Sequence, residues 1–337
     1  PPKDATAIEG LSGQTGQLVA EGATSQANAM DYFGSRYAEA VSGANLAYNA
    51  TGSGSGIKNF IGNQAVFAGS DSPLKEDKGE VEQARERCGG NDAWHLPMVI
   101  GPVAVAFNLD GVEDLNLTVD NIVEIFNGTI TKWNDPKIAE NNESAELPDQ
   151  DISVIYRSDE SGTSDNFQKF LAAASDGKWE GEGKAFPQSV GAGANGSTAV
   201  AEQVKATSGA VTYVEAGYAH DLDLGVANID FGSGAVELNN ESVNKALANV
   251  QFKSEGHDLV VDSKSLFASN NEGAYPLVLT TYEIVCSKGY DETTKNMVKD
   301  FLTIVLESQD EELEDAGFIP VSGEFADKLK ASVDAIS

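Results

Sequence analysis

The sequence predicts an α/β protein of two domains. The chain has 337 residues, which is more than a single hydrophobic core usually organises. Short apolar runs alternate with segments of helical periodicity along its whole length, a pattern typical of α/β architecture. Two longer extended runs, near 96–108 and 275–286, divide the chain into three pieces. The simplest arrangement places the first and third pieces in one domain and the middle piece in the other.

Strand and helix patterns alternate from the start of the chain. Strands are predicted at 17–20, 46–50 and 65–69, and helices near 25–37, from Ile57 onward and at 79–87. The Gly- and Ser-rich stretch 51–56 lies between the second strand and its helix, where a tight turn is expected. The first long run, 96–109, contains Pro and Gly and is too short to cross a bilayer, so it predicts a buried strand.

The second half of the chain repeats this order. Strands are predicted at 151–156, 210–214 and 275–286, and helices at 119–126, after residue 163 and near 292–306. A glycine-rich loop occupies 191–197, and the polar segment 253–274 is left unassigned.

These patterns define an expected domain organisation. We expect a flexible N-terminal tether at 1–15, a first domain formed by 16–100 and 280–337, and a second domain formed by 101–279. The two long extended runs would cross between the domains as a two-strand hinge. Because Pro1 begins no apolar signal segment, we expect that any targeting peptide has been removed.

The chain is strongly acidic. It has 53 Asp and Glu residues against 22 Lys and Arg residues, for a formal net charge of −31. A field of this sign argues against nucleic acid and anionic lipid as partners. A small anionic ligand stays possible, because salt screens surface charges over about 8 Å and donors inside a pocket can prevail.

Cys88 and Cys286 are the only cysteines of the chain. Both lie near the predicted domain crossovers, so we expect a disulfide bond between them, as is common in extracytoplasmic proteins. The alternative is a pair of buried thiols.

The segment 157–164 is the most informative local pattern. It lies where a strand ends and a helix begins, so free backbone N–H groups and the helix dipole favour an anion there. Its hydroxyls, its glycine and its arginine together suit a tetrahedral oxyanion. The residues concerned are Arg157, whose guanidinium Asp159 is placed to hold, and Ser161, Gly162 and Thr163. The alternative is a helix N-cap beside an ordinary surface ion pair.

Two further loops place hydroxyl groups at a strand-to-helix junction. One, at 21–26, carries Thr24 and Ser25, and the other, at 51–58, carries Ser53. The second loop lacks the spacing of a Walker A motif and of the dinucleotide fingerprint, so no nucleotide class is indicated. Together with the arginine segment, these junctions predict a pocket that surrounds a small anion with neutral dipoles and one arginine.

Asp71 indicates which anion this pocket would select. Monohydrogen phosphate keeps a proton that it can donate to a carboxylate, whereas sulfate near neutral pH has none. Sulfate would therefore leave two anions facing each other, at a large desolvation cost. The alternative role of Asp71 is to cap the turn at Ser72 and Pro73.

No pattern in the sequence indicates an enzyme. A phosphate-ester hydrolase, the alternative from another functional class, needs a metal cluster or an activated nucleophile. His95, His220 and His257 are isolated and lack metal-ligand spacing, and no Gly-x-Ser-x-Gly elbow occurs. We therefore expect no catalysis, no metal and no cofactor. A binding protein for another oxyanion, such as molybdate or sulfate, and an adhesion or signalling protein both stay open.

Several motifs, in this order, resemble the substrate-binding protein of the high-affinity phosphate ABC transporter, the Pst system. They lie at 22–24, 51–56, 68–74, 125–136, 157–164, 209–215 and 275–277. The resemblance implies a two-lobed, periplasmic-binding-protein-like fold of type II, with two α/β domains of mixed sheets. It also implies that inorganic phosphate binds between the lobes and is delivered to a membrane permease.

The resemblance implies a role for each candidate residue. Thr24, Ser25 and Ser53 would donate hydrogen bonds, and Asp71 would accept the phosphate proton. The cage would be completed by Arg157, braced by Asp159, and by Ser161, Gly162 and Thr163.

The chain departs from the family pattern at two of these positions. Ser25 stands where the family often has an aromatic residue, so it would contribute either its backbone only or an extra hydroxyl as well. Glu160 adds a negative charge inside the arginine segment, which is tolerable where the side chain points to solvent. The cysteines and the run 87–90 resemble Gram-positive, actinobacterial members, which implies a lipid-anchored protein at the cell surface. We expect a monomer whose partners are phosphate and the permease.

Overall fold

The computed structural model describes residues 1–337, which form a mixed α/β fold of two compact units. Unit 1 consists of Pro1–Ile100, Phe252–Val261 and Thr280–Ser337, and unit 2 consists of Gly101–Gln251 and Asp262–Leu279. The chain therefore passes between the units at four points. Two of these passages lie inside long strands, β4 (Ala93–Phe107) and β12 (Val278–Cys286), where the sequence predicts its two long extended runs.

The sheet of unit 1 has the strand order β2-β1-β3-β12. Its other strands are β1 (Gly16–Gly22), β2 (Ala44–Ala50) and β3 (Phe67–Ser70). β1 is parallel to both β2 and β3, whereas β12 is antiparallel to β3. Because β1, β2 and β3 run in the same direction, their carboxyl ends reach one edge of the sheet, where ligands commonly bind in α/β folds.

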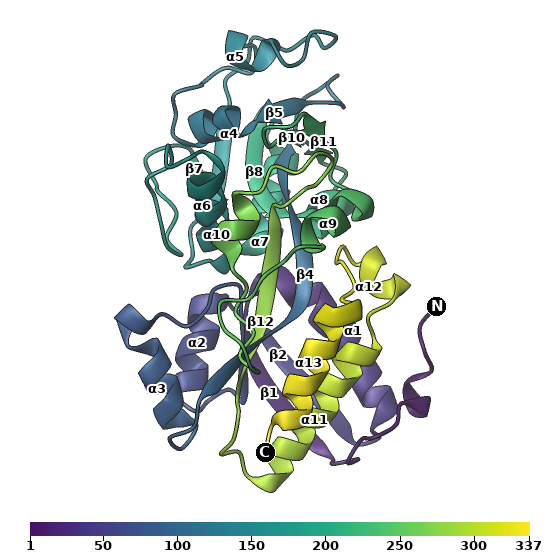
Figure 1. Ribbon diagram of the computed structural model, residues 1–337. Helices are drawn as coiled ribbons and strands as arrows, with labels where there is room; N and C mark the ends of the chain where they lie inside the picture. The colour runs from purple at the N-terminus through teal and green to yellow at the C-terminus, as the bar shows by residue number, and fades with distance from the viewer. The chain divides into compact units, whose positions relative to one another are not determined.

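Helices cover both faces of this sheet (Figure 1). One face carries α1 (Ala27–Ala40), α11 (Glu292–Glu307) and α13 (Gly323–Ala335), and the other carries α2 (Ser53–Ile61) and α3 (Glu80–Arg87). Phe301 of α11 packs on Tyr37 and Phe67, with ring centroids 5.5 and 5.8 Å apart. The shorter helices of this unit are η1 (Ala5–Ala7), η2 (Thr24–Gln26), η3 (Glu76–Lys78) and α12 (Glu311–Asp315).

Unit 2 is organised in the same way around the strand order β4-β8-β6-β7, with β9 paired to β4. Its strands are β6 (Ser153–Arg157), β7 (Ala192–Ala194), β8 (Ala210–Glu215) and β9 (Gly225–Val226). β6 is parallel to β7 and to β8, while β4 is antiparallel to β8. A second, small sheet contains β5 (Asn116–Thr118), β10 (Asn228–Asp230) and β11 (Ala235–Val236).

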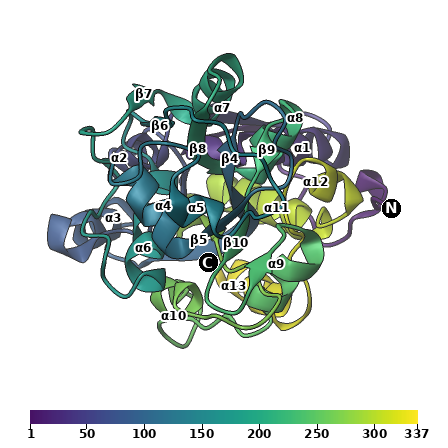
Figure 2. The same cartoon turned by 90° about the horizontal axis from the view of Figure 1, so that it is seen from above.

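The helices of unit 2 lie on both sides of β6 and β8, as the view from above shows (Figure 2). Val200 and Val204 of α7 (Gly196–Ala206) pack against one face, and α4 (Val119–Phe126) and α6 (Gly162–Ala174) cover the other. On that second face the ring of Phe167 stacks on Tyr213 at 4.6 Å. The remaining helices are α5 (Pro136–Ala139), α8 (Ala216–Asp221), α9 (Asn240–Leu247) and α10 (Ser263–Phe267).

The N-terminal segment packs on unit 1, although its composition predicts a flexible tether. Ala5 and Ile8 are buried, and the backbone N–H groups of Ser12 and Gly13 donate to the carboxylate of Asp300 in α11. These contacts join residues almost a whole chain apart, and composition carries no information about them.

The segment Phe252–Val261 also belongs to unit 1, although the sequence pattern places all of 101–279 in the second domain. Its backbone is bonded to β4 and β12: Leu259 N–H donates to the carbonyl oxygen of His95, and Val261 N–H donates to the Tyr282 hydroxyl. Asp258 in turn accepts from the backbone N–H of His95 at 2.7 Å. An irregular polar segment held by such contacts has no periodicity, so the sequence does not reveal it.

Cys88 and Cys286 form the expected disulfide bond, with their Cα atoms 5.4 Å apart. The bond links the end of α3 to the end of β12, and both sulfurs are buried beside Phe60 and Ile284. No helix in the structure combines the length and the hydrophobicity needed to cross a lipid bilayer.

Removing the disulfide is expected to destabilise the protein. The bond joins residues 198 positions apart, so the unfolded chain of a Cys88→Ala/Cys286→Ala variant regains much conformational freedom. We expect the free energy of unfolding to fall by about 2–5 kcal/mol. Denaturant unfolding followed by circular dichroism measures this change, with the reduced and alkylated parent protein as the matching control. An unchanged midpoint would contradict the prediction.

Candidate functional site

The loops that follow β1, β2 and β3 in unit 1 are held against one another by backbone hydrogen bonds. Ala23 N–H donates to the carbonyl oxygen of Gly69 at 2.9 Å, and Gly52 N–H donates to that of Gly22 at 2.8 Å. Gly22 has a φ of 154°, and a Cβ atom at this position would lie 1.9 Å from the Gly69 oxygen. Only glycine allows this approach, which brings the three loops to one place.

Asp71, which directly follows β3, lies within this group of loops and is 6% exposed. The Ser25 hydroxyl lies 2.8 and 2.9 Å from its two carboxylate oxygens, and the Thr281 hydroxyl donates to one of them. The backbone N–H of Asp71 donates to the Ser53 hydroxyl oxygen at 3.0 Å. The structure therefore gathers three of the four candidate residues of unit 1 and adds Thr281, which the sequence hides inside an apolar strand.

Two helices of unit 1 begin at these loops. Thr24 is half-buried in the first turn of η2, which leads into α1. α2 begins at Ser53 rather than at Ile57, so 53–56 forms its first turn and the expected tight turn is shorter than the sequence suggests. No side chain caps the first N–H groups of α2. These N–H groups, together with the helix dipole, favour a negative charge.

A second buried carboxyl group, that of Glu283, interacts electrostatically with Asp71. Glu283 of β12 is 0% exposed, and its Oε1 atom accepts from the side-chain amide of Gln26 at 2.6 Å. Burial raises the pKa of Glu283 well above its ordinary value; the Gln26 hydrogen bond opposes this, and the charge of Asp71 adds to it. Burial therefore favours the protonated, neutral form of Glu283.

Arg157, at the end of β6, is the centre of a second cluster, in unit 2. Its Nε and Nη2 atoms donate to the two oxygens of Asp159 at 2.8 and 2.7 Å, and Nη1 donates to the Ser197 hydroxyl at 3.3 Å. Burial alone would raise the pKa of Asp159, but the hydrogen bonds and charge of Arg157 hold it below its ordinary value. The guanidinium is thus fixed in direction while part of Nη1 and Nη2 stays available.

Helix α6 begins five residues after Arg157 along the chain. Ser161, Gly162 and Thr163 are all buried. The Ser161 oxygen accepts from Ser164 N–H at 3.1 Å, so its own hydroxyl hydrogen stays free to donate. Glu160 is exposed, so its charge faces solvent rather than the cluster. This 13-residue helix therefore begins directly after Ser161, and Thr163 lies in its first turn.

The cluster also contains residues that the sequence did not indicate. Glu215 ends β8 and accepts from the Thr163 hydroxyl at 2.8 Å. The hydroxyl groups of Tyr213 and Ser164 share a hydrogen bond of 2.6 Å, in which either can be the donor. The Tyr213 hydroxyl also accepts from the backbone N–H of Arg157 at 3.1 Å. Ser197 lies in the first turn of α7, after the glycine-rich loop. These residues lie together because the parallel strands β6, β7 and β8 end at the same edge of their sheet. Their positions at the ends of predicted strands are the signal in the sequence that could have found them.

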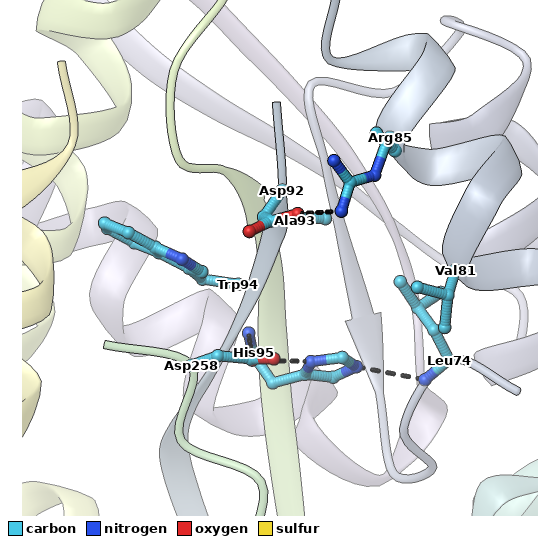
Figure 3. A pocket seen from close by; sticks show the side chains of 8 residues that line it. All are labelled: Leu74, Val81, Arg85, Asp92, Ala93, Trp94, His95 and Asp258. Carbon is cyan, nitrogen blue, oxygen red and sulfur yellow. Dashed lines mark hydrogen bonds and ion pairs between the residues drawn. The ribbon is translucent and has the colours of Figure 1, made fainter. Parts of the chain in front are cut away.

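A separate pocket of about 250 Å³ lies in unit 1, beside the segment that follows Asp71 (Figure 3). Its polar side chains are paired with one another, Arg85 with Asp92 at 2.6 Å and His95 with Asp258 at 2.8 Å. The pocket therefore offers no unpaired cation to an anion.

His95 in this pocket has a structural role. Its Nε2 atom accepts from Leu74 N–H at 3.0 Å, so Nδ1 carries the hydrogen that is donated to Asp258 (Figure 3). This pair fixes the segment that follows Asp71. His220 is exposed, and the ring of His257 lies against Trp94, so the three histidines do not form a cluster. No group of three or more His, Cys, Asp and Glu side chains is arranged to hold a metal ion.

Comparison with known proteins identifies the family. The profile of the PBP superfamily domain matches residues 8–309. The phosphate-binding proteins PstS2 and PstS3 of Mycobacterium bovis are each 44% identical to this chain; the alignments cover 95% of the chain, and 87% and 86% of those proteins. The chain belongs to the PBP superfamily, among the PstS-type proteins.

Solved structures agree with this PBP-superfamily fold. A high-affinity periplasmic phosphate-binding protein, PfluDING, solved with bound phosphate at pH 8.5, superposes with a TM-score of 0.74 at 22% identity, over 94% of this chain and 93% of that one. A phosphate-binding protein from Stenotrophomonas maltophilia gives a TM-score of 0.69 at 24% identity, over 94% of each chain. At these identities the similarity establishes the fold alone.

Replacing Glu283 by glutamine is expected to stabilise this PBP-superfamily protein at high pH. The folded pKa of Glu283 is raised, so the folded state holds this proton more tightly than the unfolded chain does. Stability is therefore lost as pH rises from the ordinary value near 4.5 towards the folded pKa. Glu283→Gln removes this loss, because the amide does not titrate.

The test is the difference in Tm between Glu283→Gln and the parent protein at acidic and at mildly alkaline pH. The difference should increase with pH in favour of the variant. A matched change at an exposed glutamate, Glu160→Gln, should show no such trend. A constant difference at all pH values would mean that Glu283 titrates normally.

Proposed function

We propose that this protein binds inorganic phosphate and delivers it to the permease of an ABC transporter. The observation that carries the proposal is the buried carboxylate of Asp71, placed among hydroxyl groups at the ends of parallel strands. An acceptor in a site otherwise made of donors selects an anion that still carries a proton. The relatives named phosphate-binding protein PstS support the same ligand and a role in transport rather than catalysis.

Each cluster contributes different chemistry to this ligand. In unit 1, Thr24, Ser53 and the start of α2 supply neutral donors, and Asp71 accepts the phosphate proton. In unit 2, Arg157 supplies charge-assisted hydrogen bonds, while Ser161, Gly162 and Thr163 belong to the start of α6. Charge-assisted hydrogen bonds contribute roughly 1.5–3 kcal/mol each, so a few are enough for micromolar or tighter binding.

Ser25 would contribute to this site through its backbone alone, one of the two contributions that the family resemblance leaves open. Its hydroxyl hydrogen is directed at Asp71 in this structure, so it holds the acceptor in place instead of donating to the ligand. Its backbone N–H, at the start of η2, remains the group that would contact phosphate.

We also infer the compartment in which the protein works. A phosphate receptor of this family works outside the cytoplasm, and the disulfide bond fits an oxidising compartment. We propose that the protein is monomeric and is anchored at the cell surface by a lipid. No cofactor takes part.

The proposed site should discriminate phosphate from sulfate. Calorimetric titration of phosphate-free protein should show one phosphate site per chain and no heat from sulfate. Asp71→Asn removes the negative charge and can donate a hydrogen bond, so it should weaken phosphate binding and make sulfate binding detectable. Binding of sulfate by the parent protein would contradict the role of Asp71, and no binding of either anion would contradict the proposed function.

The guanidinium of Arg157 should be needed for tight phosphate binding. Arg157→Lys keeps a charge but loses the two-point contact with Asp159, so the cation is no longer fixed in direction. We expect the Kd for phosphate to rise by about 10- to 100-fold at an unchanged stoichiometry. Arg85→Lys, at a half-exposed arginine of unit 1 paired with Asp92, is the matched control and should leave the Kd unchanged. Equal Kd values for both variants would exclude Arg157 as a ligand.

A further inference from the structure

A long loop, residues 175–191, joins α6 to β7 and contains no helix or strand (Figure 1). Many of its side chains are exposed, but Trp179, Lys184 and Phe186 are buried. The proposed phosphate site uses none of these three side chains. Large side chains turned inward from an irregular loop nevertheless show that the loop has a defined place on unit 2.

Gln168 of α6 attaches this loop to the helix. Its side chain is 0% exposed, and its Oε1 atom accepts from the indole N–H of Trp179 at 3.1 Å. Its Nε2 atom donates to the carbonyl oxygen of Gly183 at 2.9 Å and to that of Ala185 at 3.4 Å. All three hydrogen bonds of this amide therefore go to the loop.

The loop passes directly over the Gln168 amide. A Cβ atom added at Gly181 would lie 2.2 Å from the Oε1 atom of Gln168 and 2.9 Å from the Nε1 atom of Trp179. The ring of Phe186 completes the attachment, with its centroid 4.9 Å from that of Tyr213 and 5.7 Å from that of Trp179. A methyl group at position 181 would therefore displace the amide from the loop.

The residue between the two carbonyl groups held by Gln168 is Lys184, and its own carbonyl oxygen contacts the start of α6. It accepts from the backbone N–H of Ser161, the N-cap of α6, at 3.0 Å. The next two N–H groups, those of Gly162 and Thr163, make no hydrogen bond within the protein. They are the donors that this helix start offers to an anion, and the loop holds the residue that precedes them.

Gln168 is a polar residue among apolar ones on the buried face of α6. Phe167, Phe170 and Leu171, its neighbours in sequence, are all fully buried. An amide in such surroundings costs free energy unless it is hydrogen-bonded, whereas an apolar side chain of similar size does not. The bonds to the loop offset this cost, so the attachment of the loop accounts for the amide.

We propose that Gln168 is a positioning residue for phosphate binding by unit 2. Its amide clamps the loop on α6, and the Lys184 carbonyl then fixes the Ser161 N–H. The first turn of α6 thereby keeps its two free N–H groups in one direction. Donors that are already oriented bind an anion without a further loss of conformational freedom. This role rests on the proposed function and adds to it a residue that does not touch the ligand.

The test is the Kd for inorganic phosphate of Gln168→Met, measured by calorimetry well below the Tm of the variant. Methionine is unbranched and of similar length, so it fills the same space, but it cannot donate to the loop carbonyls. We expect the Kd to rise by about 5- to 30-fold at an unchanged stoichiometry, the effect of losing one or two hydrogen bonds. Gln203→Met, at an exposed glutamine of α7 in the same unit, is the matched control and should leave the Kd unchanged.

Hydrogen exchange of the phosphate-free protein, followed by mass spectrometry, separates positioning from general stabilisation. In Gln168→Met the segments 159–164 and 179–186 should exchange faster, because the Ser161 N–H loses its fixed acceptor. The strands β6 and β8 should exchange as in the parent protein. Faster exchange throughout unit 2 would mean that Gln168 only stabilises the domain, and it would overturn the proposal.

A second variant, Gly181→Ala, disturbs the same contact from the loop side, because its methyl group would displace the Gln168 amide. It should raise the Kd for phosphate as Gln168→Met does, which covers the case in which the methionine variant does not fold. An unchanged Kd in either folded variant would overturn the role of Gln168 and leave the receptor function standing. Absence of phosphate binding by the parent protein would overturn both.

Discussion

The direction of the strands is the constraint on which both clusters depend. In each unit, adjacent parallel strands end at one edge of the sheet, and almost every candidate residue lies within a few positions of such an end. Asp71 follows β3, Arg157 ends β6 and Glu215 ends β8. Residues far apart in sequence thereby become neighbours without any long loop, and the helices that begin at the same edge add their free N–H groups.

Carboxylates give these clusters their chemical character. Asp159 directs the guanidinium of Arg157, Asp71 and Glu215 accept hydroxyl hydrogens, and burial raises the pKa of Glu283. A site built only from donors would attract any small anion. In the proposed phosphate site, acceptors placed among the donors would replace that general attraction by a requirement for hydrogen on the ligand.

The sequence predicts the order of the main elements and the loops that carry the candidate residues, because hydrophobic periodicity and glycine-rich junctions are local properties. It misses Thr281 and Glu215, since both lie in runs that are otherwise typical of buried strands. The contacts of Phe252–Val261 and of the N-terminal segment with unit 1 are long-range and leave no local trace. The early start of α2 is also hidden, because Ser53 to Gly56 have low helix propensity, and the close approach of Gly56 to the carbonyl of Glu21 in β1 is a long-range contact.

The disulfide bond also decides how mechanical force travels through the molecule. All of unit 2 lies between Cys88 and Cys286 along the chain. Tension applied to the two chain ends therefore runs through unit 1 and across the sulfur–sulfur bond, and no part of unit 2 is pulled. In the same way, a protease that cuts a loop of unit 2 leaves both fragments joined by a covalent link. Unit 2 is thus a closed loop carried by unit 1, sheltered from strain that reaches the protein through its termini.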